Sequence, residues 1–229
     1  MANMIIGFIA IIGTIASYIL ARALYARHRL LIFLPFYVAL TMIIVVLVIG
    51  QIPYDTYMIG GKWIHALLGP AVVALAYPLY EQRDLLRRLA FPILLGSLVG
   101  ALVGLFTGLL LAKLVNLDDK LLYTLLPKSV TTPVAMDISE SLGGIAPLAA
   151  ILVIVAGLTG VLLGPLMFRI FNLRTEIGRG VGIGSASHAI GTATAFENSE
   201  LEGSISTIAM IVNAVFVSIL TPIVISPFM

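Results

Sequence analysis

Residues 132–151 read TPVAMDISESLGGIAPLAAI, and residues 192–211, which begin 60 positions later, read TATAFENSELEGSISTIAMI. Eight of the 20 aligned positions are identical: Thr132/Thr192, Ala135/Ala195, Ser139/Ser199, Glu140/Glu200, Gly143/Gly203, Ile145/Ile205, Ala149/Ala209 and Ile151/Ile211. Asp137 and Glu197 also share a negative charge. Self-similarity at a fixed spacing indicates two copies of one structural unit. Because the shared positions include carboxylates and hydroxyls, the repeat predicts a polar site built from two related halves.

The chain around the repeat has the composition of a membrane protein. Of its 229 residues, 60% are hydrophobic and 10% are charged, whereas a soluble domain carries about 25% charged residues. A bilayer is crossed by about 20 apolar residues, and runs near that length predict spans at 4–21, 30–50, 63–80, 90–114, 145–168 and 204–225. We therefore expect an all-α polytopic membrane protein, with the lipid bilayer as its surroundings.

Composition also excludes several kinds of function. The absence of cysteine excludes disulfides, thiolate metal sites and a cysteine nucleophile. The small net charge of +2 is placed at helix ends, which does not favour nucleic-acid binding. No spacing of His, Asp and Glu predicts a metal site, and no cofactor is expected. No nucleophile and base are placed together, so we do not expect an enzyme.

Arginines between the predicted spans set the expected topology. Basic loops face the cytoplasm, and three basic clusters occur: Arg22, Arg27 and Arg29; Arg83, Arg87 and Arg88; and Arg169, Arg174 and Arg179. Two predicted crossings separate the first cluster from the second, which agrees with the rule. The third cluster is cytoplasmic only if the segment 121–142 dips into the membrane and returns.

This topology predicts an inverted repeat. Each copy, 121–168 and 181–228, becomes a re-entrant hairpin followed by one full span. The odd number of crossings inverts the second copy, a plan common in secondary transporters. A discontinuous spanning helix remains the alternative to each hairpin. We expect one membrane domain over 1–229, with 1–58 as scaffold or dimerisation helices and 60–229 as the core that contains the repeat.

Breaks inside the two copies are the candidate binding site. Thr132 precedes Pro133, which predicts a helix start with Thr132 as N-cap, and Gly191-Thr192 holds the same place in the second copy. Two half-helix N-termini that point at each other would attract an anion such as a small carboxylate. The predicted substrate-binding residues are Lys128, Ser129, Thr131, Thr132, His188, Gly191 and Thr192. The alternative is that the threonines only cap helices and Lys128 extends to the interface.

Acidic residues follow both breaks. Ionisable groups within membrane segments are expensive and usually functional, and Asp137 and Glu197 are expected to lie deep enough to couple transport to an ion. Glu140, Glu200 and Glu202 are instead expected in water at the hairpin mouths, because they lie near Gly143 and Gly203.

Three strings resemble the LrgB/CidB family of antiholin-like membrane proteins: LLPKSVTTPVAMDISESLGGIAPLAA (125–150), GIGSASHAIGTATAFENSELEGS (182–204) and LLGPAVVALAYPLYEQ (67–82). The resemblance implies a multi-pass protein of a bacterial inner (plasma) membrane. Members of this family are described as regulators of murein hydrolase export that act with a small LrgA/CidA-like partner. A plastid glycolate/glycerate translocator resembles a fusion of both components, and some bacterial relatives are implicated in pyruvate uptake.

Two functions therefore compete. The first is transport by alternating access of small monocarboxylates of the glycolate, glycerate or pyruvate class, bound between opposed half-helix ends. The second is antiholin-like regulation of murein hydrolase export and lysis together with the LrgA/CidA-like partner. Either function is expected of a homo-oligomer, most simply a dimer.

Overall fold

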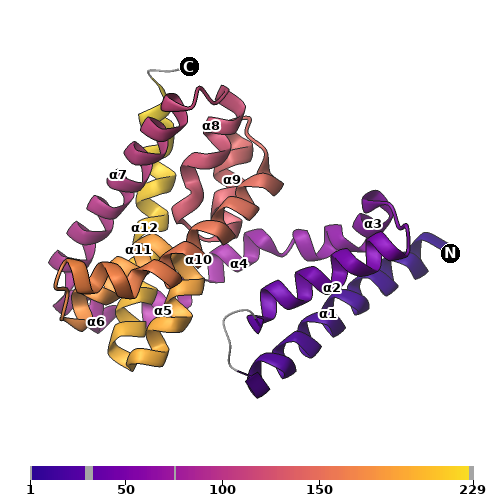
Figure 1. Cartoon of the computed structure of the whole chain (residues 1–229), viewed down its shortest axis with the longest axis horizontal. Helices are drawn as coiled ribbons and strands as arrows, with labels where there is room; N and C mark the ends of the chain where they lie inside the picture. The colour runs from indigo at the N-terminus through magenta and orange to yellow at the C-terminus, as the bar shows by residue number, and fades with distance from the viewer. Residues whose placement is uncertain (1, 29–32, 75, 227–229) are drawn as a thin grey trace. The chain divides into compact units, whose positions relative to one another are not determined.

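A computed structural model of the chain describes residues 2–28, 33–74 and 76–226, and every regular element among them is a helix (Figure 1). The chain divides into two compact units, Met1–Pro70 and Ala71–Met229, with the division inside α4 (Leu68–Ala74). The predicted division between scaffold and core, near residues 58–60, lies about one short helix earlier. The all-helical, multi-pass membrane fold predicted from the composition is confirmed.

In the first unit, α1 (Ala2–His28) packs against α2 (Pro35–Ile49) and α3 (Tyr54–His65). A side chain at Gly60 of α3 would collide with the backbone of Gly7, so the two helices approach closely at this point. The hydroxyls of Thr14 and Tyr57 share a hydrogen bond of 2.9 Å across the same contact.

Four helices among the described residues are long and apolar enough to cross a membrane: Asn3–His28, α7 (Ala90–Leu114), α10 (Ala146–Ile170) and α12 (Glu200–Ile225). They match four of the predicted spans. The predicted span 30–50 contains α2, which has only 15 residues. Arg29 and positions 30–32 lie outside the described residues, as do the last two positions of the predicted second copy, 227–228.

The predicted span 63–80 is wrong as a single helix. α3 ends at His65, and α4 begins at Leu68. Pro70 has no N–H to donate to Ala66, and its ring would crowd that carbonyl in a continuous helix. The helix therefore restarts so that Pro70 falls in its first turn, and the short helices α5 (Ala76–Glu81) and α6 (Arg83–Arg88) complete the segment.

The first copy of the repeat begins with a helical hairpin. Its inward arm, which leads to the tip of the hairpin, is α8 (Asp119–Leu125) with the 3₁₀ turn η2 (Leu126–Ser129). Its outward arm, which leads away from the tip, is α9 (Thr132–Ser141). The Ile145 N–H donates to the Thr124 hydroxyl at 2.8 Å, although 21 positions separate them. One continuous helix would hold these groups about 31 Å apart. The chain therefore reverses, as the hairpin interpretation predicts.

The second copy begins with a hairpin as well. α11 (Glu176–Asn198) contains one non-helical residue, His188, with φ 41° and ψ −136°. Arg179 before that residue and Asn198 after it both donate to the carboxylate of Glu202, at 2.9 Å. One straight helix would separate Arg179 from Asn198 by about 28 Å, so α11 is two antiparallel arms with His188 at the tip.

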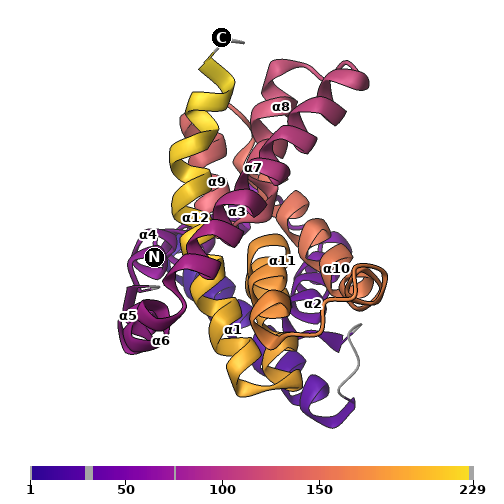
Figure 2. The ribbon, with the colours of Figure 1, turned by 90° about the vertical axis from the view of Figure 1, so that its left-hand side faces the viewer.

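The two hairpins open at opposite ends of α10. Ile145, at the mouth of the first hairpin, directly precedes α10, and the second hairpin starts at Glu176, just after α10 ends. A helix of 25 residues separates the two mouths by about 37 Å. Figure 2 shows the same arrangement, with α9 beside one half of α12 and α11 beside the other.

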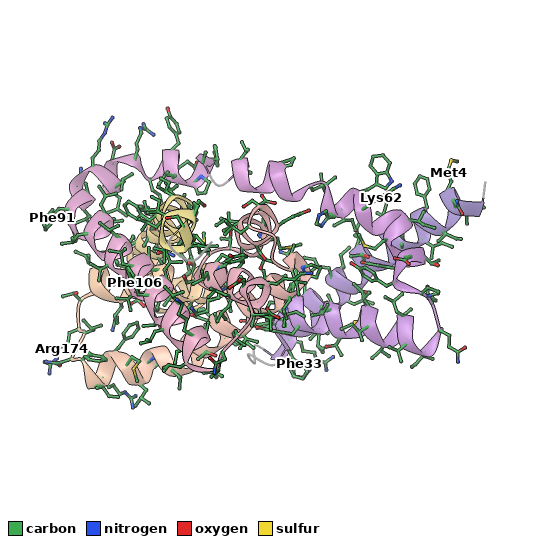
Figure 3. All side chains as sticks on the ribbon, turned by 90° about the horizontal axis from the view of Figure 1, so that it is seen from above. Met4, Phe33, Lys62, Phe91, Phe106 and Arg174 are labelled. Atoms are coloured by element: carbon green, nitrogen blue, oxygen red, sulfur yellow. The ribbon has the colours of Figure 1, made fainter. Side chains whose placement is uncertain are left out.

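The interior of the second unit consists of two apolar clusters at different levels of α12. One cluster joins Leu105, Leu126, Val130 and Val153 to Ala214 and Val217. The other joins Ile93 and Val181 to Ile208, Ala209 and Val212. The outer face of α7 is apolar too, and Phe91 points away from the neighbouring helices (Figure 3). A helix that is apolar all round suits lipid on one side and a core on the other.

Candidate functional site

The tip of the first hairpin is an extended break between two helical arms. Val130 is extended at φ −114° and ψ −179°, and Thr131 is the N-cap of α9. The predicted N-cap, Thr132, is wrong by one residue, because Pro133 occupies the second helical position rather than the first. The Thr131 hydroxyl makes no cap hydrogen bond. Its backbone starts the helix while its side chain stays available.

The tip of the second hairpin lies at His188, and the predicted break at Gly191-Thr192 is wrong. A positive φ is uncommon outside glycine, although histidine adopts it more often than most residues. The ring holds the residue in place, because Nε2 donates to the Val153 carbonyl of α10 at 2.9 Å. A Cβ at Gly157 would lie 2.6 Å from His188 Cε1, so the glycine lets the ring reach α10.

Gly191 and Thr192 lie one turn inside the outward arm. The Thr192 hydroxyl donates to the His188 carbonyl at 2.8 Å and accepts from the Ser206 hydroxyl at 2.8 Å. A side chain at Gly191 would collide with Ser187 and Ile183 of the inward arm. Thr192 therefore links the outward arm to α12, and Gly191 lets the two arms approach closely.

Asn213 of α12 joins the two tips. Its amide nitrogen donates to the Ser129 carbonyl at 3.0 Å and to the Ser185 carbonyl at 3.2 Å. The side chain is completely buried. Val212 belongs to one apolar cluster and Ala214 to the other, so the amide marks the level at which the clusters meet.

Polar atoms without partners gather at this level. They are Ser129 Oγ, Thr131 Oγ1, Ser185 Oγ and Asn213 Oδ1, each at least 90% buried and each without a hydrogen bond among the described residues. Buried polar atoms are nearly always paired, so such a concentration requires an explanation. Three residues contribute hydroxyls and one an amide oxygen, and none carries a charge.

Glycines of α7 face these atoms. A Cβ at Gly104 would lie 3.1 Å from Ser129 Oγ. A Cβ at Gly100 would lie 3.4 Å from Ser185 Oγ and 4.0 Å from Asn213 Oδ1. The same face of α7 therefore brings the first tip, the second tip and α12 to one place, which we call the tip site: Gly100, Gly104, Ser129, Thr131, Ser185 and Asn213.

Lys128 places a cation at the edge of the tip site. Its ammonium donates to the Gly104 carbonyl at 3.1 Å, and the residue is half-buried. Within the described part of the chain, no carboxylate forms an ion pair with it. Thr132 is half-buried in the first turn of α9, beside Thr131. A cation, hydroxyl donors and a helix N-terminus together can bind a small anion.

The acidic residues lie elsewhere. Asp137 and Glu197 are exposed on the surface of the protein, like Glu140 and Glu200. Their role in ion coupling stays a prediction.

Glu202 contradicts the expectation that it lies in water. It is fully buried, and its carboxylate accepts from Arg179 and Asn198. Its N–H also donates to the Ser199 hydroxyl at 3.0 Å, which caps α12. The pairing closes the mouth of the second hairpin, because both arms and α12 meet at this carboxylate.

Sequence reasoning found Lys128, Ser129 and Thr131 but missed the α7 glycines, Ser185 and Asn213. Asn213 carried a signal, since it is the one amide within the apolar run 204–225, and polar residues in such runs usually have a role. Gly100 and Gly104 belong to a four-residue spacing of glycines in α7, which is typical of close helix packing.

Comparisons with known proteins agree on the family. The LrgB-like family matches residues 14–226. The uncharacterized protein YxaC of Bacillus subtilis is 43% identical over 220 residues, covering 96% of each chain. The holin-like protein CidB of Staphylococcus epidermidis is 33% identical and covers 95% of each chain. The antiholin-like protein LrgB of Bacillus mycoides is 33% identical over all of this chain and 98% of its own. No solved structure matches the chain.

Proposed function

This chain belongs to the LrgB-like family of bacterial membrane proteins, and we propose that it transports small monocarboxylates across the inner membrane by alternating access. One observation carries this proposal. Two hairpin tips from opposite ends of α10 meet at a buried cluster of polar atoms without partners. Transporters of several folds bind their substrate where broken helices meet near the middle of the bilayer.

The direction of the hairpins supports an inverted repeat. The connection from α10 to α11 carries Arg174 (Figure 3), and by the positive-inside rule it faces the cytoplasm. The second hairpin then enters from the cytoplasm and the first from outside. The contacts between spans and tips are also exchanged between the two copies. Asn213, in α12 of the second copy, bonds to the tip of the first hairpin. Val153, in α10 of the first copy, bonds to the tip of the second hairpin. Asn213 and Val153 are themselves 60 positions apart.

The chemistry of the tip site suits a small carboxylate. Lys128 supplies a positive charge that no carboxylate of the described residues neutralises. Charge-assisted hydrogen bonds to a carboxylate are about twice as strong as neutral ones. The hydroxyls of Ser129, Thr131 and Ser185 can turn their hydrogens toward the substrate, because none of them is used elsewhere. The backbone of α7 lies close to both tips there, because its glycines place no side chain between the helix and the tips.

Alternating access needs tips that move against the helices beside them. Gly100 and Gly104 of α7 and Gly157 and Gly160 of α10 face the tips without side chains. Smooth helix faces of this kind permit close sliding contacts. The tips would therefore shift along α7 and α10, so that the tip site opens first to one side of the membrane and then to the other.

Uptake into proteoliposomes tests the proposal. Purified full-length protein should take up labelled lactate, glycolate or pyruvate with saturable kinetics. The double variant Ser129→Ala and Ser185→Ala should reduce uptake by about tenfold or more, because two hydrogen bonds to the carboxylate are lost. The matched control is Thr159→Val, an exposed α10 hydroxyl bonded only to Val155 of its own helix, which should retain uptake. Uptake no greater than in empty vesicles would refute transport.

The second candidate function is antiholin-like regulation of murein hydrolase export and lysis. The comparisons favour it over transport, because relatives that match nearly the full length are named holin-like CidB and antiholin-like LrgB. This function requires a small LrgA/CidA-like partner, whereas a homodimer is expected of either function. We propose the first unit as the contact surface for the partner. Large apolar side chains such as Phe8 and Ile12 of α1 are exposed there.

Co-purification distinguishes the two functions. A regulator should pull down a co-expressed LrgA/CidA-like protein and show no flux in proteoliposomes, and its effect on lysis should survive the Ser129→Ala and Ser185→Ala double variant. A transporter should lose its physiological effect together with uptake in that variant.

A further inference from the structure

A crevice lies between α1 and α3 of the first unit, at the N-terminal end of α1. It has a volume of about 530 Å³, and most of its lining is apolar, including Gly7 and Ile59. Met4 of α1 and Lys62 of α3 also line it, and both are labelled in Figure 3 at the same end of this unit. Sites for small ligands have volumes of about 300–1,000 Å³, so the crevice is large enough to hold one.

The crevice has a polar end and an apolar end. Asn3, in the first turn of α1, lines the polar end. Because α1 and α3 are antiparallel where they touch, Lys62 lies near the level of Asn3. Ile11 lines the apolar end, about 12 Å further along the axis of α1. The hydrocarbon layer of one leaflet is about 15 Å thick, so the crevice follows α1 through most of a leaflet.

Lys62 brings a positive charge to the polar end. Its ammonium lies 5.9 Å from the centre of the Trp63 ring, and no carboxylate among the described residues forms an ion pair with it. Asp55, the acidic residue of α3, is seven positions away, about 10 Å along the helix. The first turn of α1 has no acidic side chain, and its N–H groups form the positive end of the helix dipole. An anion is therefore favoured at this end.

The polar end lies at the outer surface of the membrane. Arg27, in the last turn of α1, faces the cytoplasm by the positive-inside rule, so the start of α1 faces outside. Tryptophan concentrates at the level of the lipid headgroups, and Trp63 is exposed on the same helix as Lys62. Lysines that set topology lie in cytoplasmic loops, so the outer position of Lys62 requires another explanation.

We propose that the crevice binds one anionic phospholipid of the outer leaflet, with the phosphate at Lys62 and one acyl chain between α1 and α3. A phospholipid has the two parts that the crevice separates, a negatively charged headgroup and an apolar chain. The helices touch at Gly7 and Gly60, so the space beside this contact suits a thin chain better than a helix, which is about 10 Å across. The inference holds whether the protein transports carboxylates or regulates lysis.

Fluorescence of Trp63 tests this site directly, because it is the only tryptophan of the chain. Full-length protein is reconstituted into vesicles of phosphatidylglycerol and phosphatidylcholine in equal amounts, with bromine on the acyl chains of one lipid or of the other. Bromine quenches tryptophan fluorescence on contact. Brominated phosphatidylglycerol should quench more strongly, with a binding preference of about fivefold, which is what one lysine contributes near an anionic membrane surface.

Lysine variants separate the crevice from general attraction of anionic lipid. Lys62→Gln should abolish the preference for phosphatidylglycerol, whereas Lys62→Arg keeps the charge and should retain it. Lys120→Gln is the matched control, because Lys120 is an exposed lysine of α8 on the same side of the membrane in the inverted arrangement, and the preference should remain. Since Lys62 is exposed too, these variants should fold normally.

Equal quenching by the two brominated lipids in the unmodified chain would overturn the proposal. A preference that survives Lys62→Gln would do the same, because the anionic headgroup would then bind elsewhere. Quenching by neither lipid would mean that a second copy of the chain covers the crevice instead. Soluble glycerol phosphate should not relieve the quenching, because it has no acyl chain to hold it. Relief would identify a soluble anion, rather than a lipid, as the ligand.

Discussion

Asn213 and Ser129 lie 84 positions apart, yet the amide of the first donates to the carbonyl of the second at 3.0 Å in the middle of an apolar helix packing. The Ser129 carbonyl belongs to a hairpin tip, where the chain has no helical partner to offer it. An unpaired buried carbonyl is costly, so the amide on α12 is what allows the chain to break there. The same amide also holds Ser185, at the second tip.

Replacing Asn213 with leucine should destabilise the protein. The change leaves the carbonyls of Ser129 and Ser185 buried without this donor, which we expect to cost about 1–3 kcal/mol. Thermal unfolding of the purified protein in detergent measures it. Ser218→Ala is the control, because its hydroxyl bonds only to Ala214 of the same helix. Equal unfolding temperatures for the two variants would mean that the bridge contributes nothing.

The ion pair at the second hairpin mouth gives a prediction of its own. Arg179→Met should cost about 3 kcal/mol or more, because the carboxylate of Glu202 is fully buried and keeps only Asn198 as a side-chain donor. The double variant Arg179→Met and Glu202→Met should recover much of that loss, since no buried charge remains. Stability losses of the single variants that simply add in the double variant would contradict the pairing.

Two glycines of α10 form a matched pair for a steric test. A Cβ at Gly157 would lie 2.6 Å from the His188 ring, whereas nothing lies within 4 Å of a Cβ at Gly164. Gly157→Ala should destabilise the protein by about 1–3 kcal/mol, because the ring must leave the Val153 carbonyl. Gly164→Ala should be neutral or slightly stabilising, because alanine favours the helix. The same unfolding assay in detergent measures both variants. If Gly157→Ala is as harmless as Gly164→Ala, the contact of the His188 ring with α10 is contradicted.

The repeat in the sequence was enough to predict two hairpins, because charge placement required the segment 121–142 to return to the side from which it entered. The same repeat led to a wrong position for the second tip, because Thr192 matches Thr132 in the alignment and was therefore assigned to the break. The true tip residue, His188, aligns with Lys128 and shares no residue type with it. A break made by one positive φ at a non-glycine residue leaves no composition signal that a reader of the sequence can use.

Tertiary contacts account for the other differences. Glu202 lies beside Gly203, where the sequence predicts a hairpin mouth in water, but Arg179, 23 positions earlier in the chain, pairs with its carboxylate and permits its burial. Asn213 sits in a run whose hydropathy predicts only a span. Its partners are backbone carbonyls of two distant tips, which no local pattern reveals. The segment 63–80 is apolar enough to span, yet Pro70 interrupts its helix.

Cysteine labelling tests the opposed entry of the hairpins. The chain has no cysteine, so single introduced thiols are read without background. Arg174→Cys lies in the connection before the second hairpin and should be labelled from the cytoplasmic side by an impermeant reagent. Val115→Cys, exposed where α7 ends before the first hairpin, should be labelled from outside. Labelling of both positions from the same side would contradict the inverted arrangement.

The most direct measurement of the central claim is protection of the tip site by its substrate. Ser129→Cys and Ser185→Cys, made separately, place a thiol on each hairpin tip, and Thr159→Cys places one on the exposed face of α10 as control. The rate of modification by a small thiol reagent is measured in proteoliposomes with and without saturating lactate. The account predicts that lactate slows modification at both tips and leaves the control unchanged. Rates at Ser129→Cys and Ser185→Cys that lactate does not alter would contradict a carboxylate site between the two hairpins.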